Sequence, residues 1–405
     1  MTVSQSDNEL MTRVAGQAPM GRFLRESFWF PATISALLTP DGDPVPVRLL
    51  GSDYVAFRGT GGKVAIFSEH CPHRGASLLL ARNEDNALRC IFHGWKFNVE
   101  GRCVEVPTQP EHHDEFCKSV PLKSFPVREA GGLIWVWLGR SEPAPFPAFE
   151  FTQLTGNQVR ASLQRLKFNW IQAIEGAVDS AHVSILHQDW LDKAGAGGTA
   201  LAAAALDRAP VYEFENQPGG FRYAAIRKAG EGNRYIRVTE YVAPWYCFIP
   251  FSTGNIQISV PMDDETTALY FVQYNRDGPV PVSTYGPTSN PGNFPPYLTA
   301  GKEGRWGQDR DIMKRESFTG FRQHLMHEDW SVAESQGTLM DRSGEFLNVG
   351  DRAVMQFRRL LLDSVKEFQK GERPRIGCHE QIPYPKIRGH AAVVAADTNW
   401  KEHFK

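Results

Sequence analysis

Between residues 28 and 138, apolar and polar residues alternate over short runs, and Gly or Pro separates one run from the next. A period of two is typical of β-strands that bury one face, and Gly and Pro mark the turns between strands. This part of the chain is therefore predicted to form a compact β domain. The runs that predict strands are 45–51, 53–59, 63–69, 87–98 and 132–139.

A Pro-dense segment interrupts this pattern. Residues 142–149 read EPAPFPAF, and such a segment is stiff and extended, as interdomain linkers often are. The chain of 405 residues is long enough for two or three domains. We therefore expect a domain boundary near residue 145.

Beyond this boundary the pattern is first helical, then β, then helical again. Residues 167–187 predict a helical stretch, and five alternating runs then predict an antiparallel sheet. Residues 277–297 hold six Pro and show no apolar period, so we expect a loop there. Residues 351–370 predict one amphipathic helix, and the fold class is therefore α+β. The predicted sheet strands are 211–216, 221–228, 234–242, 255–262 and 268–275.

Composition narrows the classes of function. The formal net charge is −2, with 44 Lys and Arg against 46 Asp and Glu, and the sequence has no block of like charges. Nucleic acids and anionic membrane surfaces therefore find no evident docking site. No apolar stretch is long enough to cross a bilayer, and the N-terminus lacks the features of a secretory signal. We expect a cytoplasmic protein, where close groups of Cys and His are more typical of metal sites than of disulfides.

Two short motifs in the N-terminal region carry metal-binding residue types. Cys71 and His73 are one residue apart, and Cys90 and His93 follow sixteen residues later with two residues between them. Short spacings of this kind place two side chains on one tight turn, so that both can reach a single metal site. The other cysteines have no such spacing, and we expect them to be ordinary buried thiols.

The identity of this metal site depends on how the ligands are paired. Zinc accepts the same four ligands, but zinc fingers usually pair Cys with Cys and His with His. Here each motif offers one Cys and one His, which suits a 2Fe-2S cluster with two thiolates on one iron and two imidazoles on the other. Gly75 and Gly94 follow the two motifs, and we expect them to let the backbone approach closely.

A second group of candidate ligands opens the region after the linker. Asp179, His182 and His187 follow one another as DxxHxxxxH, and on a helix the first two would share a face. The two histidines are five residues apart, so both can reach one metal only if the helix ends or distorts between them. Two His and one carboxylate form the facial triad of non-heme Fe(II) oxygenases. The C-terminal segment offers three further carboxylates for this triad, Glu328, Asp329 and Glu334.

The two Cys/His motifs resemble those of Rieske proteins, whose CxH…CxxH signature is matched in full. Respiratory Rieske proteins carry an extra Cys in each loop, and Ala76 and Phe92 stand at those positions here. The resemblance is therefore to the oxygenase branch. The segment from Glu328 to Glu334 resembles the C-terminal iron-ligand helix of phthalate-dioxygenase-like Rieske oxygenases, which implies that Asp329 completes the iron site. Glu328 and Glu334 would then either contact the ligands from behind or face solvent, and we favour the interpretation that they are exposed helix carboxylates.

This resemblance spans nearly the whole chain and implies an architecture. It implies an all-β Rieske 2Fe-2S domain at residues 27–145, joined to a helix-grip (START-like) catalytic domain made of residues 1–26 and 146–405. It also implies a homo-oligomer, a trimer or a hexamer, in which the cluster of one subunit serves the mononuclear iron of its neighbour. Asp179 would then link His182 to His93 of that neighbour.

The resemblance further implies an aromatic ring-hydroxylating oxygenase that uses dioxygen. Nothing in the sequence matches a dinucleotide-binding or flavin site, so electrons from NAD(P)H must come from a separate reductase with flavin and 2Fe-2S groups. Monooxygenation or O-demethylation of an aryl ether would use the same residues. Two other classes stay open at this point: a Rieske electron carrier, and a ligand-binding helix-grip protein with a structural zinc.

The expected substrate is a small aromatic carboxylate, as for phthalate-type relatives. A carboxylate needs a cation or hydroxyl donors at the wall of its pocket, and Arg supplies the strongest contacts. Ser180, next to Asp179, and Arg208 are the predicted substrate residues. Arg222, Arg227 and Arg237 on the following strands are the alternatives.

Overall fold

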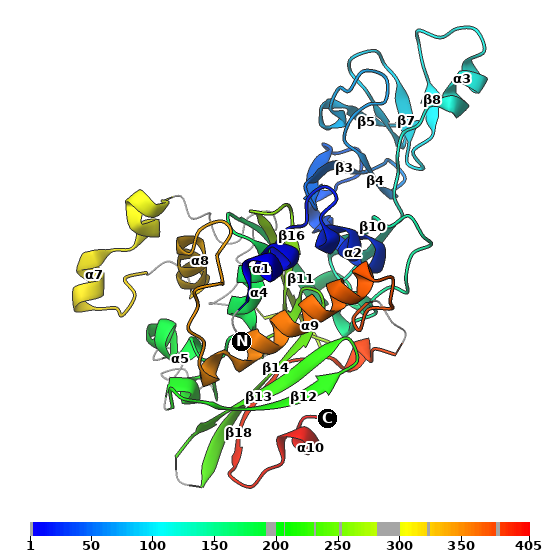
Figure 1. The fold of residues 1–405 in the computed structure, drawn as a ribbon. Helices are drawn as coiled ribbons and strands as arrows, with labels where there is room; N and C mark the ends of the chain where they lie inside the picture. Colours follow the sequence, from blue (N-terminus) through cyan, green and yellow to red (C-terminus); the bar gives the residue numbers. More distant parts are fainter. Residues whose placement is uncertain are drawn as a thin grey trace.

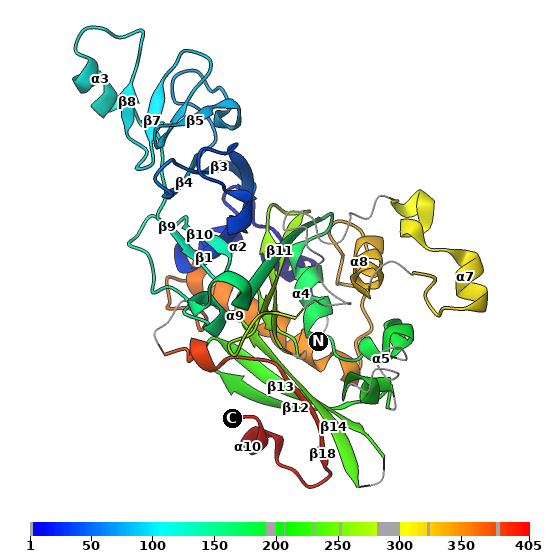
Figure 2. The same cartoon turned by 180° about the vertical axis from the view of Figure 1, so that it is seen from behind.

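The computed structural model describes residues 3–191, 200–205, 207–230, 232–250, 253–281, 300–321, 325–377 and 381–405. Figures 1 and 2 show a narrow arm (residues 45–120) that projects from a larger body formed by the other described residues. Most of the Pro-rich segment expected as a loop, and Cys378, lie outside the described residues. Within the described part of the chain, no helix is long and apolar enough to cross a membrane.

The arm and its base consist of short antiparallel strands, as the alternating pattern predicts. The predicted run 87–98 differs, because it is two strands with the turn Cys90–Trp95 between them. The sheet at the base contains β1 (Trp29–Ile34), β10 (Leu133–Trp137) and β9 (Val127–Ala130) in that order, and the arm contains β2 (Val45–Leu49), β3 (Ser52–Arg58), β4 (Val64–Ser68), β5 (Arg82–Glu84), β6 (Ala87–Arg89), β7 (Lys96–Asn98), β8 (Cys103–Glu105) and α3 (His113–Ser119).

The body contains an antiparallel sheet in the order β11-β17-β16-β15-β14-β13-β12, with β18 paired to β14. The five predicted runs form five of these strands, and the α+β class is confirmed. Strand β11 precedes the predicted runs, and β15 and β18 were not foreseen because they are short or lie near the C-terminus. The strands are β11 (Val159–Leu166), β12 (Val211–Gln217), β13 (Gly220–Lys228), β14 (Asn233–Val242), β15 (Tyr246–Phe248), β16 (Gly254–Pro261), β17 (Thr267–Tyr274) and β18 (His390–Ala395).

Helices cover this sheet. The helix predicted at 351–370 is α9, and the N-terminal helices α1 and α2 pack against it (Figure 1). The α-helices of the body are α1 (Gln5–Thr12), α2 (Pro19–Ser27), α4 (Trp170–Val178), α5 (Val183–Leu186), α7 (Arg310–Arg315), α8 (Leu325–Ser335), α9 (Arg352–Gln369) and α10 (Trp400–His403). Short 3-10 helices lie at Ser35–Leu37, Leu78–Leu80, Glu150–Gln153, Gly156–Gln158, Ala200–Ala205, Lys302–Gly307, Val349–Asp351 and Tyr384–Lys386.

Aromatic side chains join the base of the arm to the body. The ring centroids of Phe30 and Trp245 are 4.8 Å apart, and those of Trp135 and Tyr246 are 6.4 Å apart. These residues belong to one buried hydrophobic cluster that continues into the body. Such ring pairs add about 0.5–1.5 kcal/mol each to the stabilisation from buried area. The arm is therefore fixed to the body at its base and does not hang from a free linker.

Two buried arginines and two largely buried glutamates hold α4 in place. Glu175 on α4 pairs with Arg342 at 2.8 Å and with Arg358 of α9 at 2.6 Å, and Arg358 also pairs with Glu345. Arg342 donates a further hydrogen bond to Asn8 of α1 at 3.0 Å. Burial opposes charge on Glu175, but the two guanidinium groups outweigh it and lower the pKa of this carboxyl. The network ties three helices together around the segment that leads to Asp179.

We predict that Glu175→Gln lowers the free energy of unfolding by about 3–5 kcal/mol at neutral pH, because it leaves two buried guanidinium groups without a counter-charge. The folded-state pKa of Glu175 is lowered, so its contribution is present above its unfolded pKa of about 4.3 and is lost as the pH falls through the folded value. Urea unfolding at a series of pH values measures both effects.

The control is Asp7→Asn, which removes an exposed ion pair with Lys366 of α9. We expect a loss of less than about 1 kcal/mol for this surface pair. Equal unfolding midpoints for the two variants at neutral pH would contradict the importance of the buried network.

Candidate metal centres

The two Cys/His motifs of the arm fold into matching turns. The amide of Gly75 donates to the carbonyl of Cys71, and the amide of Gly94 donates to that of Cys90, both at 2.9 Å. Gly75 and Gly94 have φ values of +73° and +76°, which L side chains rarely adopt. The positive φ values explain why glycine stands at both positions.

The side chains of these turns meet in two pairs, His73 with His93 and Cys71 with Cys90. The rings of His73 and His93 have centroids 4.5 Å apart, and Trp95 stacks on His73 at the same distance. Nδ1 of His93 is buried and has no hydrogen-bond partner in the described part of the chain. Burial and the neighbouring thiol of Cys90 raise the pKa of Cys71 to about 11 in the absence of metal. Two sheltered thiols and a buried imidazole nitrogen without a partner suit the ligand set of a 2Fe-2S Rieske cluster.

The remaining described cysteines are buried, as the sequence predicts. Cys103 and Cys117 nevertheless meet, with their Sγ atoms 3.5 Å apart behind the cluster turns. Cys247 lies alone in the body, where it contacts the carbonyl of Ala177. None of these three thiols joins the described ligand groups.

The predicted helix 167–187 breaks where the second metal site needs it to break. Asn169 caps the start of α4, and Asp179 is the residue at its C-terminal end. His182 begins the single turn of α5, and His187 ends it. Asp179 and His182 therefore lie in a turn between two helices and not on one helical face. Helix α5 also ends at Leu186, between the two histidines as the sequence required, and this end lets His187 turn to the side on which His182 lies.

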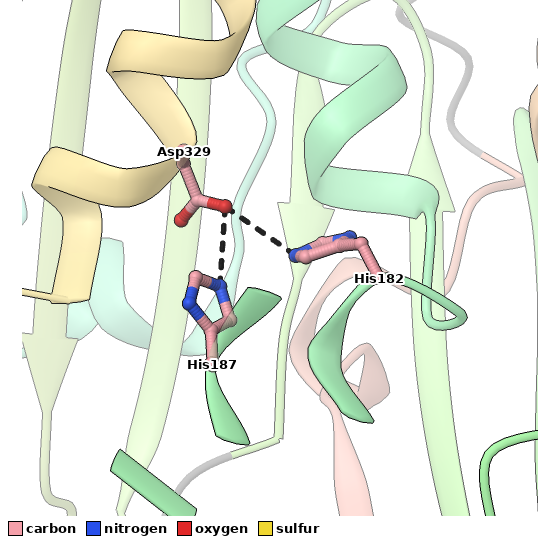
Figure 3. A group of neighbouring side chains, drawn as sticks. All are labelled: His182, His187 and Asp329. Atoms are coloured by element: carbon pink, nitrogen blue, oxygen red, sulfur yellow. Dashed lines mark ion pairs between the residues drawn. The ribbon is translucent and has the colours of Figure 1, made fainter. Parts of the chain in front are cut away.

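Helix α8 supplies the carboxylate of this group. Oδ1 of Asp329 lies 3.1 Å from Nε2 of His187 and 3.4 Å from Nε2 of His182 (Figure 3). The ligand atoms of the three residues all lie within 4.8 Å of one another. Two ligands about 2.1 Å from one metal, at roughly right angles, are themselves about 3 Å apart. Spacing and donor types therefore suit one divalent iron bound on a single face.

Asp179 lies behind His182. Its Oδ2 is 3.4 Å from Nδ1 of His182, and its Oδ1 accepts a hydrogen bond of 2.7 Å from the amide of Ala181. Burial opposes the charge of Asp179, but His182 and nearby amides outweigh it and lower the pKa of this carboxyl. Asp179 is therefore an ionised partner on the side of His182 that faces away from Asp329.

Glu328 was interpreted as an exposed helix carboxylate, and this interpretation was wrong. Its side chain is 0% exposed, and its Oε2 lies 2.7 Å from Nδ1 of His187. Its Oε1 accepts a hydrogen bond of 2.5 Å from the hydroxyl of Thr319. One feature of the sequence could have indicated this role, namely the position of Glu328 next to Asp329. Two successive residues of a helix can approach two sides of one imidazole ring, here that of His187. Glu334 is half-buried and does not belong to the group around the histidines.

The electrostatics of the site favour a bound cation. Burial disfavours charge on His182, but Asp179 and Asp329 outweigh it and raise the pKa of this imidazole to about 10. Burial also opposes the charge of Asp329, and the two imidazoles hold its pKa well below the usual range. Without metal, protons therefore balance the buried carboxylates, and a divalent ion can take their place.

A partly open cavity of about 140 Å³ adjoins the three ligand atoms. Its walls are mainly apolar, from α4, α8 and the sheet, and Phe168, Phe271 and Trp330 belong to one hydrophobic cluster there. Four polar residues of the sheet also line the cavity. The sequence could have indicated these residues, because they are polar and stand at strand positions whose side chains point into the protein. They are Arg237, Asn255, Gln257 and Gln273.

The predicted substrate residues lie elsewhere. Ser180 is buried and contacts Arg227, whereas Arg208 is exposed and donates to Gln188 at 3.4 Å. Neither Ser180 nor Arg208 is among the described residues that line the cavity. Arg222 is paired with Glu215. Of the five predicted candidates, Arg237 is the one that reaches the cavity wall.

Comparison with known proteins agrees with this arrangement. The family model of the Rieske 2Fe-2S domain matches residues 28–126, and the model described as LigXa C-terminal domain like matches residues 136–405. The chain is 34% identical to the phthalate 4,5-dioxygenase oxygenase subunit of Pseudomonas putida, over 99% of this chain and 94% of that protein.

Two further relatives have similar coverage. The 3-chlorobenzoate-3,4-dioxygenase oxygenase subunit of Comamonas testosteroni is 31% identical over 98% of this chain and 97% of its own length. The 5,5'-dehydrodivanillate O-demethylase oxygenase subunit of Sphingobium sp. is 26% identical over 96% of this chain and 88% of its own length.

The fold agrees with solved structures. The terminal oxygenase of carbazole 1,9a-dioxygenase from Nocardioides aromaticivorans superposes with a TM-score of 0.60 at 18% identity, over 89% of this chain and 97% of that chain. A bare electron carrier or a zinc-stabilised binding protein does not account for matches of this length to oxygenase subunits. The chain belongs to the Rieske non-heme iron oxygenases, as an oxygenase subunit of their phthalate-dioxygenase-like branch.

Proposed function

We propose that this protein hydroxylates a small aromatic carboxylate with dioxygen. The observation that carries the proposal is the convergence of His182, His187 and Asp329 at a mainly apolar cavity with Arg237 in its wall. The residues proposed to hold the 2Fe-2S cluster are Cys71, His73, Cys90 and His93. The experiment that tests the proposal is product analysis with aromatic mono- and dicarboxylates, NAD(P)H and a reductase.

The residues of the protein bind the metals, orient the substrate and shield it from water. When bound, the cluster supplies single electrons and the mononuclear iron supplies the activation of dioxygen. His182, His187 and Asp329 occupy one face of the site, which leaves the cavity side free for dioxygen and substrate. Phe168, Phe271 and the other apolar walls hold an aromatic ring and exclude water from it.

Arg237 suits a substrate carboxylate. Its side chain is buried, and its Nε has no hydrogen-bond partner in the described part of the chain. Oε1 of Gln273, also on the cavity wall, is buried and unpartnered in the same sense. A guanidinium can donate two parallel hydrogen bonds to a carboxylate, and an amide beside it can donate a third. The carboxylate of an aromatic acid would therefore accept from Nε of Arg237, for which the described residues supply no partner, whereas Oε1 of Gln273 would need a donor on the substrate.

Electrons must enter through the arm. We propose a separate NAD(P)H-dependent reductase with flavin and 2Fe-2S groups as their source, and the cytoplasm as the compartment of both proteins. In Figures 1 and 2 the arm lies at one end of the molecule, away from α5 and α8. This separation supports transfer from the cluster of one subunit to the iron of the next, in a trimer or hexamer. Asp179 is proposed to accept a hydrogen bond from His93 of that next subunit.

Exposed apolar residues near both centres support such a contact between copies. Ile91 and Phe92, between the cluster ligands Cys90 and His93, are 60% and 52% exposed. Near the iron site, Phe346 and Val349 are 99% and 79% exposed, in a segment that continues to Gly350 beside Ala181. Exposed apolar patches of this kind are typical of interaction sites.

We retain the proposed division into residues 27–145 and residues 1–26 with 146–405. The packing of α1 and α2 against α9 supports the assignment of the N-terminus to the catalytic domain. The second candidate function is O-demethylation of an aryl ether, favoured by the relative that is named an O-demethylase. Release of formaldehyde from a methoxylated aromatic acid would select this alternative over ring hydroxylation.

We predict that His182→Ala, His187→Ala and Asp329→Ala each lose the mononuclear iron. Total iron should fall from about three to about two atoms per chain, with the Rieske spectrum retained. Cys71→Ser should instead abolish the visible spectrum. Glu334→Ala is the control and should keep all iron. If Asp329→Ala kept its iron while Glu334→Ala lost it, the choice of carboxylate would be wrong.

We predict that Arg237→Gln lowers kcat/KM for the aromatic acid about 10- to 100-fold, as expected for loss of a charge-assisted hydrogen bond. The loss should appear mainly in KM and should be absent for the neutral methyl ester. Arg208→Gln is the matched control, and its kcat/KM should stay within about twofold of wild type, as for surface changes remote from a site. A loss confined to Arg208→Gln would show that the carboxylate binds elsewhere.

We predict that Asp179→Asn keeps both metals and the oligomer but slows electron transfer by orders of magnitude. The amide is similar in shape but lacks the charge that holds the N–H groups of His182 and of the neighbour's cluster ligand. Rapid mixing of the pre-reduced protein with dioxygen and substrate measures the oxidation of the cluster. A wild-type rate in this variant would mean that electrons take another route.

A further inference from the structure

Glu328, in the first turn of α8, is held by two contacts. Its Oε2 lies 2.7 Å from Nδ1 of His187, and its Oε1 accepts the hydroxyl of Thr319 at 2.5 Å. Among the described residues, no Lys or Arg forms an ion pair with this fully buried carboxylate. An isolated charge in such a place is strongly unfavourable unless hydrogen bonds satisfy it. The imidazole of His187 is therefore its essential partner.

We propose that Glu328 is a positioning residue for the mononuclear iron site. It accepts Nδ1–H of His187, which fixes the tautomer and turns the Nε2 lone pair toward Asp329. This inference rests on the proposed role of His187 as an iron ligand. A carboxylate on the outer nitrogen of a metal-bound imidazole also raises the basicity of the inner nitrogen.

Two successive residues of one helix thereby contact both nitrogens of one ring. Glu328 meets Nδ1 of His187, and Asp329 lies 3.1 Å from its Nε2. Adjacent positions on a helix are about 100° apart, so the two carboxylates can reach opposite sides of the ring. The ring is held in its plane without any contribution from the metal, which makes the site ready to bind it.

The short helix α5 makes such an external support necessary. His187 ends a helix of one turn, and a single turn has little stability of its own. The segment that carries Thr319 also fixes the chain after His187, because the amide of Phe318 donates to Asp189 at 2.9 Å. The Thr319 segment and Glu328 therefore fix the position of α5 relative to α8.

The two histidines have different carboxylate partners. Asp179, on Nδ1 of His182, has a side chain that is 25% exposed and is proposed to face a neighbouring subunit. Glu328, on Nδ1 of His187, is sealed from solvent. Asp179 thus suits electron entry, whereas Glu328 suits retention and orientation of the metal alone. Removal of Glu328 should therefore weaken metal binding without affecting electron entry to the cluster.

The test is titration of Co(II) into full-length protein that retains its cluster but lacks the mononuclear iron. Co(II) reports both affinity and ligand geometry through its visible bands. We expect Glu328→Gln to bind Co(II) about 10- to 100-fold more weakly, the range found when the outer carboxylate of a metal-bound His is changed. The Co(II) bands should also shift, which a general loss of stability would not cause.

Glu334→Gln on the same helix is the matched control and should bind Co(II) as wild type does. Equal affinity and an unchanged Co(II) spectrum in Glu328→Gln would overturn the inference, as would an equally large loss in Glu334→Gln. If Glu328→Gln does not retain the Rieske spectrum, Thr319→Val decides, because it removes one hydrogen bond to Glu328 and keeps the carboxylate. Wild-type affinity in Thr319→Val would then reject the inference, and a severalfold loss with shifted bands would support it.

The proposed iron site itself is tested separately by His187→Ala. Wild-type Co(II) binding in His187→Ala would reject the site as a whole. Loss in His187→Ala together with normal binding in Glu328→Gln would reject the role of Glu328 alone.

Discussion

The buried charge network around Glu175 is the constraint on which the iron site depends. It joins α4 to Arg342 and to Arg358 of α9, and through Arg342 it reaches α1. Asp179 follows directly at the end of α4, where its amide donates to the carbonyl of Glu175 at 3.1 Å. The turn that carries the first ligand therefore starts from a fixed point. The sheet adds to this fixation, because Tyr223 of β13 and Gln257 of β16 donate hydrogen bonds to backbone carbonyls of α4.

From that fixed point, the site is built by giving each imidazole a carboxylate on its outer nitrogen. His182 faces Asp179 and His187 faces Glu328, while Asp329 stands between the two inner nitrogens. Three carboxylates near two imidazoles are unfavourable without a cation, since burial opposes charge on all of them. The same excess of negative charge favours a divalent metal. The excess of buried carboxylates therefore explains both why the site without metal is unfavourable and why it binds a metal.

The sequence predicted those features whose geometry is local. The strand runs, helix α9 and the two Cys/His turns depend on residues within a few positions of one another, and the structure places them as expected. In the helical stretch at 167–187, an end between the two histidines was foreseen, but the earlier break between α4 and α5 was not, because it depends on the cap at Asp179. The interpretation of Glu328 as exposed failed for a related reason. Its contacts are with Thr319 and His187, which lie outside α8, and the pattern of residues within the helix does not show them. Arg237 could not be separated from Arg208 before the cavity was known.

The aromatic contacts at the base of the arm bear on how the two proposed centres communicate. Phe30 and Trp135 of the base pack against Trp245 and Tyr246 in one continuous core. Swinging the arm toward its own iron site would expose this core, and each large aromatic side chain buries about 150–250 Å². The free-energy cost of exposing this core is larger than the stabilisation that a transient contact between the arm and its own iron site could provide. A fixed arm with exposed apolar residues beside a cluster ligand therefore supports the proposed contact with the iron site of another copy, and under that proposal the reaction depends on assembly as well as on the residues of one chain.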